Sequence, residues 1–247
     1  MGPTQIALLI LGGVGLMAIA AVFIQAAENR KKAKQLQLMK LQGAIRRAHH
    51  LLSNFPPLLQ NPDINKFLMQ YLTVRCQAVL QLEESEATEK LLNDIKQQAE
   101  QAQTPAAHPE GSITLFPNPN GAQRARAILK EFVKFVKEAE TNGEISGNAS
   151  QILIQRAKDC FERTEIDLEL HEARETEEIN AGKGAFLIYK KTFIRLSELS
   201  KNYTLDRQLF ELRNRMNMLA EQIEKHNEEE RERIRREAEE NEKRFLF

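Results

Sequence analysis

Apolar residues recur at steps of three and four along most of the chain, which is the spacing of one face of an α-helix. The spacing predicts a first helix that runs to Leu52, with Leu38, Leu41, Ile45, Ala48 and Leu52 on one face. It also predicts helices that open at Asn61-Pro62, after Ser85, and over residues 122–140, 148–180, 185–199 and 205 onward. For the helix that opens at Asn61-Pro62, the predicted apolar face is Ile64, Phe67, Leu68, Tyr71, Val74, Ala78 and Leu82.

Helix-ending residues separate these stretches. Pro56 and Pro57 end the first helix, because proline lacks a backbone N–H donor and disfavours helix in the residue before it. Asn61 is a favourable cap before a proline at the first helical position. Gly143 and Gly182 predict a helix end and a tight break between helices.

Residues 103–121 predict the main linker or surface loop, because four of the eight prolines and two of the eleven glycines lie there. Within this stretch, residues 113–116 (Ile-Thr-Leu-Phe) form an apolar patch. We expect the patch to dock on a neighbouring helix, and a short peptide motif for a partner is the alternative.

The residues at the start of the chain are typical of a membrane anchor. Residues 6–27 are apolar apart from Gln25, and 22 helical residues span about 33 Å, against a hydrocarbon core of roughly 30 Å. A basic collar follows, formed by Arg30, Lys31, Lys32 and Lys34. Because positive charge keeps its flank of a membrane segment in the cytoplasm, we predict the N-terminus outside and the rest of the chain inside. We also expect the collar to attract anionic lipid.

Two other interpretations of this segment remain open. A signal peptide cleaved near Ala18-Ile19-Ala20 would export the chain, although residues 1–5 lack the positive charge that such peptides carry. A buried core helix would show a polar stripe, which residues 6–27 lack.

The last helix has the most regular pattern, a seam with steps of four and three. The seam residues are Leu205, Leu209, Leu212, Met216, Leu219 and Ile223. We predict that the seam binds a protein partner, with a second copy of the chain or the protein's own fifth helix as alternatives. Residues 228–244 follow with 14 charged residues in 17, which favours a solvated single helix. The chain then ends in an apolar tip, Phe245, Leu246 and Phe247, a second candidate partner contact.

The charge distribution predicts helix neighbours. Residues 121–137 carry five basic residues and one acidic, residues 165–178 carry seven acidic and one basic, and residues 183–195 carry four basic and none acidic. This order suits three antiparallel helices with the acidic one in the middle. Nucleic-acid binding by Arg126, Lys130 and Lys134 is the disfavoured alternative, because no aromatic platform accompanies them.

Composition and motifs argue against several classes of fold and of functional site. Aromatic residues make up 6% of the chain and Trp is absent, which argues against a sheet-based fold, and two cysteines cannot build a disulfide framework. His171 opens His-Glu-Ala-Arg-Glu and lacks the second histidine of a helical zinc site. Gly182-Lys183-Gly184 lacks the rest of a phosphate-binding loop. We therefore predict no catalytic, metal or cofactor site and no enzyme, although a site built from scattered residues would leave no motif.

These patterns together predict an all-α protein: one N-terminal transmembrane helix, an amphipathic helical bundle, and a C-terminal coiled-coil or charged single helix. The predicted divisions are a membrane anchor (1–27), a juxtamembrane basic helix and helical hairpin (28–102), a linker (103–121), a bundle with the seam (122–227) and a charged tail (228–247).

This layout resembles that of bacterial division and envelope-assembly adaptors, which implies a bacterial inner membrane. The predicted function is a single-pass, membrane-anchored cytoplasmic adaptor that holds a protein partner or complex at the membrane. The alternative is an exported helical holdase or spacer.

Overall fold

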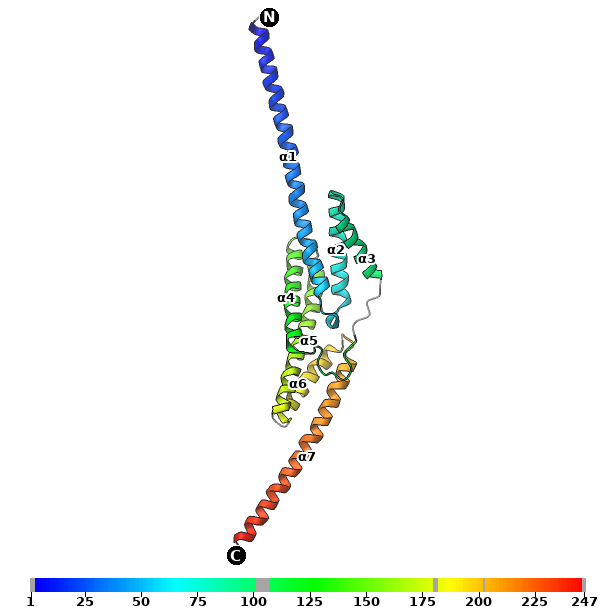
Figure 1. The fold of residues 1–247 in the computed structure, drawn as a ribbon, viewed down its shortest axis with the longest axis vertical. Helices are drawn as coiled ribbons and strands as arrows, with labels where there is room; N and C mark the ends of the chain where they lie inside the picture. Colours follow the sequence, from blue (N-terminus) through cyan, green and yellow to red (C-terminus); the bar gives the residue numbers. More distant parts are fainter. Residues whose placement is uncertain (1–2, 101–106, 180–181, 202, 246–247) are drawn as a thin grey trace. The chain divides into compact units, whose positions relative to one another are not determined.

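The computed structural model describes the backbone of residues 3–100, 107–179, 182–201 and 203–245, and side chains over 23–100, 107–178, 182–201 and 203–241. The described residues form seven α-helices and one short 3-10 helix, with no strand, which confirms the all-α prediction (Figure 1). The elements are α1 (Pro3–Asn54), η1 (Pro57–Leu59), α2 (Pro62–Leu82), α3 (Glu86–Glu100), α4 (Pro119–Thr141), α5 (Gly147–Ile179), α6 (Lys183–Leu199) and α7 (Asp206–Phe245).

The helix ends follow from local hydrogen bonds. The Asn61 side-chain oxygen accepts from the Asp63 N–H at 2.9 Å, and the Ser85 hydroxyl accepts from the Thr88 N–H at 3.3 Å. Gly143 has a φ of 71°, in the left-handed region that favours glycine after a helix. These three predicted boundaries are confirmed.

Helix α4 begins inside the predicted linker. The Asn118 side chain accepts a hydrogen bond from the Gly121 N–H, and Pro119 occupies the first turn. An asparagine cap followed by proline is a helix-opening signal, and it moves the start of this helix from residue 122 to Pro119.

The chain divides into two compact units, of which the first contains Met1–Ser53 and Lys66–Gln103. Leu38, Ile45 and Ala48 of α1 are buried, as their spacing predicts. On α2, Ile64 and Leu68 of the predicted face are buried, but the buried stripe continues through Leu72, Cys76 and Val79, and Val74 of the predicted face is exposed. The prediction was therefore wrong at Val74, because α2 is apolar enough to offer two stripes and its sequence alone does not say which one is covered.

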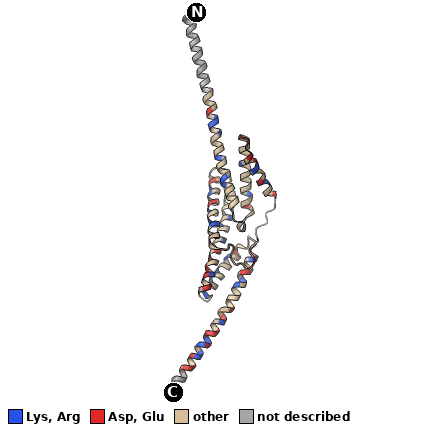
Figure 2. Ribbon diagram, viewed as in Figure 1, with Lys and Arg blue, Asp and Glu red and all other residues tan. Residues whose placement is uncertain are grey.

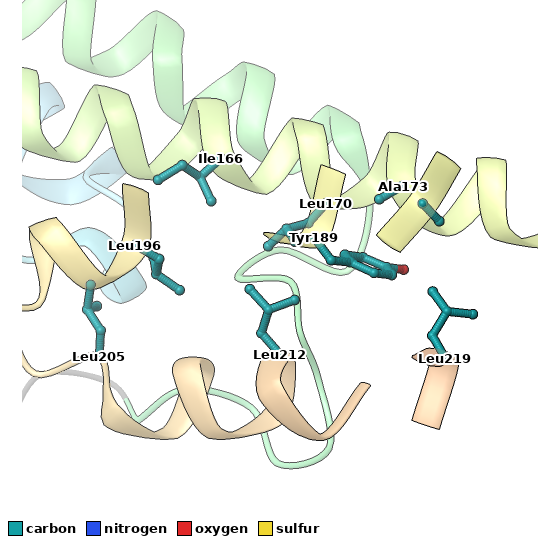
Figure 3. Packing of buried hydrophobic residues seen from close by; sticks show 9 residues of the cluster. Ile166, Leu170, Ala173, Tyr189, Leu196, Leu205, Leu212 and Leu219 are labelled. Carbon is teal, nitrogen blue, oxygen red and sulfur yellow. The ribbon is translucent and has the colours of Figure 1, made fainter. Parts of the chain in front are cut away.

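The second unit contains Asn54–Asn65 and Thr104–Phe247. Its helices form successive hairpins in which α5 packs against both α4 and α6, and α6 packs against α7. A hydrophobic cluster fills the space between α5, α6 and α7 (Figure 3). Its buried members are Ile166, Leu170, Ala173, Ala185, Tyr189, Leu196, Leu205, Leu212 and Leu219.

Residues 113–116 dock on α5, as expected. The buried Asp167 carboxylate accepts hydrogen bonds from the backbone N–H groups of Leu115 and Phe116. His171, one turn further along α5, lies 3.1 Å from the Phe116 carbonyl oxygen. Leu115 and Phe116 are buried, so the patch is a structural element of the second unit.

In the part of the chain where the side chains are described, no helix is long and apolar enough to cross a bilayer. The predicted anchor, residues 1–27, falls mainly outside that part, since side chains are described only from residue 23 onward.

Candidate functional sites

The basic collar lies on an exposed stretch of α1. Arg30, Lys31, Lys32 and Lys34 are all exposed, as are the other residues from 23 to 37. Figure 2 shows these basic residues as a blue group on α1. The collar therefore has free access to whatever surrounds α1, and its contact with lipid stays a prediction.

The predicted seam lies inside the second unit. Leu205, Leu212 and Leu219 are buried, and Leu209, Met216 and Ile223 pack against the same cluster (Figure 3). Of the alternatives that the sequence left open, packing within the bundle is the one observed, although the helices that cover the seam are α5 and α6 rather than α5 alone. Partner binding through the seam stays a prediction, and it would require α7 to separate from α6.

A polar network lies beside the middle of the seam. The Tyr189 hydroxyl donates to a Glu177 carboxylate oxygen at 2.9 Å. Arg215 of α7 donates to the same carboxylate through its Nε, at 3.2 Å, and through one terminal nitrogen. Burial is the main reason why the pKa of Tyr189 is raised, so the phenol stays protonated and remains a donor. One carboxylate thus links α5, α6 and α7.

The C-terminal part of α7 forms what we call the charged rod, residues 228–241. Every side chain in this range is exposed. Three ion pairs join residues one turn apart: Arg236–Glu232 at 3.3 Å, Arg235–Glu239 at 3.6 Å and Arg233–Glu237 at 3.7 Å. Figure 2 shows acidic and basic residues interspersed along this part of the helix. The side chains of the predicted tip, Phe245, Leu246 and Phe247, lie outside the described residues.

Helix α5 lies between two basic neighbours, in the order that the charge distribution predicts. On the α6 side, Arg195 pairs with Glu162, Glu165 and Glu169, at 3.0, 3.3 and 2.7 Å. On the α4 side the contact is different, since the Arg126 guanidinium lies 4.3 Å from the centre of the Phe161 ring.

The second unit also contains a cavity of about 620 Å³. It is lined by four parts of the chain that are distant in sequence: residues 58–63, the 107–116 loop, the α5 arginines and residues 203–208. The lining includes Arg156, Arg163, Arg207, His108, Tyr203 and Gln208. Only Leu205 among these residues was a predicted site residue.

Two of the three arginines in this pocket have acidic partners. Arg156 Nε donates to Asp63 at 2.9 Å, and Arg207 pairs with Glu110 at 2.5 Å. Arg163 differs, because its contact among the described residues is one terminal nitrogen 3.3 Å from the Leu58 carbonyl oxygen. Its Nε is buried and has no acceptor there. Burial lowers the pKa of Arg163, while the nearby Asp167 opposes that shift.

Two further polar atoms of the pocket residues lack partners among the described residues. His108 Nε2 lies 2.6 Å from the Ser112 carbonyl oxygen, so Nε2 carries the hydrogen and the buried Nδ1 is an unused acceptor. Burial lowers the pKa of His108, which favours this neutral form. Gln208 donates to the Ile113 carbonyl oxygen at 3.0 Å, while its own Oε1 is buried and unpaired.

Tyr203 completes the pocket wall. Its hydroxyl donates to Asp159 at 3.1 Å and receives a long contact, 3.5 Å, from the Asn61 side-chain nitrogen. Burial raises the pKa of Tyr203, so it serves as a neutral donor and acceptor rather than as a base.

The thiols and carboxylates do not assemble into a further site in the described part of the chain. Cys76 and Cys160 are free and buried, and burial raises the pKa of the Cys160 thiol to about 11. A protonated thiol is a poor nucleophile. No group of three or more His, Cys, Asp or Glu side chains able to hold a metal ion occurs among the described residues.

Comparison with known proteins adds no relative: no family model, curated protein or solved structure matches this chain.

Proposed function

We propose that the protein is a single-pass, membrane-anchored adaptor that holds a protein partner at the cytoplasmic face of a membrane. The observation that carries this proposal is α1, one uninterrupted helix from Pro3 to Asn54. It joins the apolar segment of residues 6–27, the exposed basic collar and the buried residues around Ile45 within a single element.

The positions of charge along α1 support the proposed orientation. A membrane helix keeps the flank richer in Lys and Arg in the cytoplasm, and residues 28–60 contain seven basic residues and one acidic. The exposed collar side chains are free to reach lipid phosphates, at about 1 kcal/mol for each basic residue near an anionic surface.

The charged rod is the surface that we assign to the partner. Its exposed side chains include Ile234, an apolar residue among charges. The seam is less suited to this role because its residues are used by the bundle. An exported holdase or spacer is the second candidate, and it requires cleavage near Ala18-Ile19-Ala20.

Single-cysteine labelling with a membrane-impermeant maleimide tests the topology in cells. Thr4→Cys lies before the apolar segment and Ala238→Cys lies on the exposed rod, and the native Cys76 and Cys160 are buried. We expect Thr4→Cys to react in intact cells and Ala238→Cys to react only after permeabilisation. The reverse pattern would refute the orientation, and a shortened chain would support the exported alternative.

Site-specific photocrosslinking tests the adaptor role. A photoreactive residue at Ile234, on the rod, should yield adducts with another protein, whereas one at Leu212, in the core, should yield only intramolecular products. Absence of intermolecular adducts from the whole rod would contradict the assignment of the partner surface.

A further inference from the structure

Arg163 carries a positive charge that is partly buried in the bundle. A buried cation normally has a carboxylate partner, because desolvating an unpaired charge is costly. Asp167, one turn along α5, is near enough to favour the charged guanidinium, but it makes no ion pair with Arg163 and is used by the N–H groups of Leu115 and Phe116. Asp167 is therefore occupied by backbone donors, and it leaves Arg163 without a direct ion pair.

The pocket around Arg163 has the size and polarity of a ligand site. Its volume of about 620 Å³ falls within the ~300–1,000 Å³ range of small-molecule pockets. Three arginines and two aspartates line it. Arg156 is paired with Asp63, and Arg207 is paired with Glu110, so Arg163 is the lining arginine that has no ion-pair partner among the described residues.

The unpaired atoms define what such a ligand would carry. Buried polar atoms in folded proteins are nearly always hydrogen-bonded, so three unpaired ones among the residues of one pocket call for an explanation. Arg163 Nε is a donor, whereas His108 Nδ1 and Gln208 Oε1 are acceptors. A ligand that pairs with all three atoms would carry an anionic oxygen group next to hydrogen-bond donors.

We infer that this pocket binds a small molecule through an oxyanion, a carboxylate or a phosphate group, held by the guanidinium of Arg163. The planar fork of an arginine fits both groups, and such charge-assisted bonds are about twice as strong as neutral ones. Slight side-chain rotation of His108 and Gln208 would present their free acceptors to hydroxyl or amino groups of the same molecule. This ligand site is independent of the adaptor role.

Thermal unfolding of the purified full-length chain tests the inference. The probes are sodium acetate and sodium phosphate, each compared with sodium chloride at equal ionic strength. We expect at least one oxyanion to raise the midpoint in a saturable way, because a ligand that binds only the folded state stabilises it. A saturating response to acetate assigns a carboxylate ligand, and one to phosphate assigns a phosphate ligand.

Three variants make the test specific. Arg163→Gln should weaken the apparent affinity at least tenfold, and Arg163→Lys should weaken it less, since lysine keeps the charge and loses the fork. Arg174→Gln removes an exposed arginine of the same helix, outside the pocket lining, and should bind as the wild type does. If Arg163→Gln fails to fold, Arg163→Lys and Arg174→Gln still separate the pocket from general charge. The inference fails if chloride matches both oxyanions, or if the Arg163 variants respond as the wild type does.

Discussion

The two parts of α7 belong to one helix and are held in different ways. From Leu209 to Ile223, apolar residues one or two turns apart pack on α5 and α6. Along the rod, by contrast, all side chains from 228 to 241 are exposed, and ion pairs join residues four apart. The first part is stabilised by burial, at about 25 cal/mol per Å², and the second by pairs of ~0.2–0.5 kcal/mol each. A helix can thus leave a bundle and continue, provided that its sequence changes from periodic apolar residues to alternating charges.

The largest loss of stability should come from truncating a buried side chain of the seam. Leu212→Ala removes a fully buried side chain, and we expect it to lower the free energy of unfolding by about 2–5 kcal/mol through lost transfer energy and a residual cavity. Ile234→Ala is the matched control on the rod, where the side chain is 57% exposed, and it should change stability by no more than about 0.5 kcal/mol. Denaturant unfolding measures both values. Equal losses would mean that the rod is covered in solution.

A smaller effect is expected at the turn that faces the seam. Gly182 has a φ of 87°, and a Cβ there would lie 2.5 Å from Leu219 Cδ1. Gly182→Ala should therefore cost about 2–4 kcal/mol, from the left-handed backbone and from overpacking. Gly143→Ala has a similar φ of 71° but no heavy atom within 4 Å of the added Cβ, so it should cost only about 1 kcal/mol. If both variants unfold at the same denaturant concentration, the close approach of Leu219 to this turn is incorrect.

Local signals predicted most of the helix ends. Asn61, Ser85 and Gly143 act within a few residues of themselves, so their chemistry is visible in the sequence. The same holds for the seam, whose spacing shows that one face is covered. What covers the face is a tertiary property, and the sequence left a partner, a second copy and the bundle itself as alternatives.

The pocket could not be predicted in this way. Its lining residues come from stretches as distant as Asn61 and Gln208, and no periodic pattern relates them. One signal was available on α5, where Asp167 and His171 continue the three-four stripe of Leu153, Ala157, Cys160 and Thr164. Polar residues on a buried stripe indicate specific partners. In this structure those partners are the backbone groups of Leu115 and Phe116, beside the pocket that Arg163 and Leu115 line.

Amide hydrogen exchange along α7 tests the division of this helix most directly. We expect the amides of residues 212–223 to exchange slowly, in step with unfolding of the bundle, because their helix is packed on α6. Amides of residues 230–241 should exchange on the order of 100-fold faster, since only local helix opening is needed. A steep rise in exchange rate after Ile223 is the predicted result. Uniformly slow exchange to residue 241 would contradict the account, because it would require the rod to be covered as well.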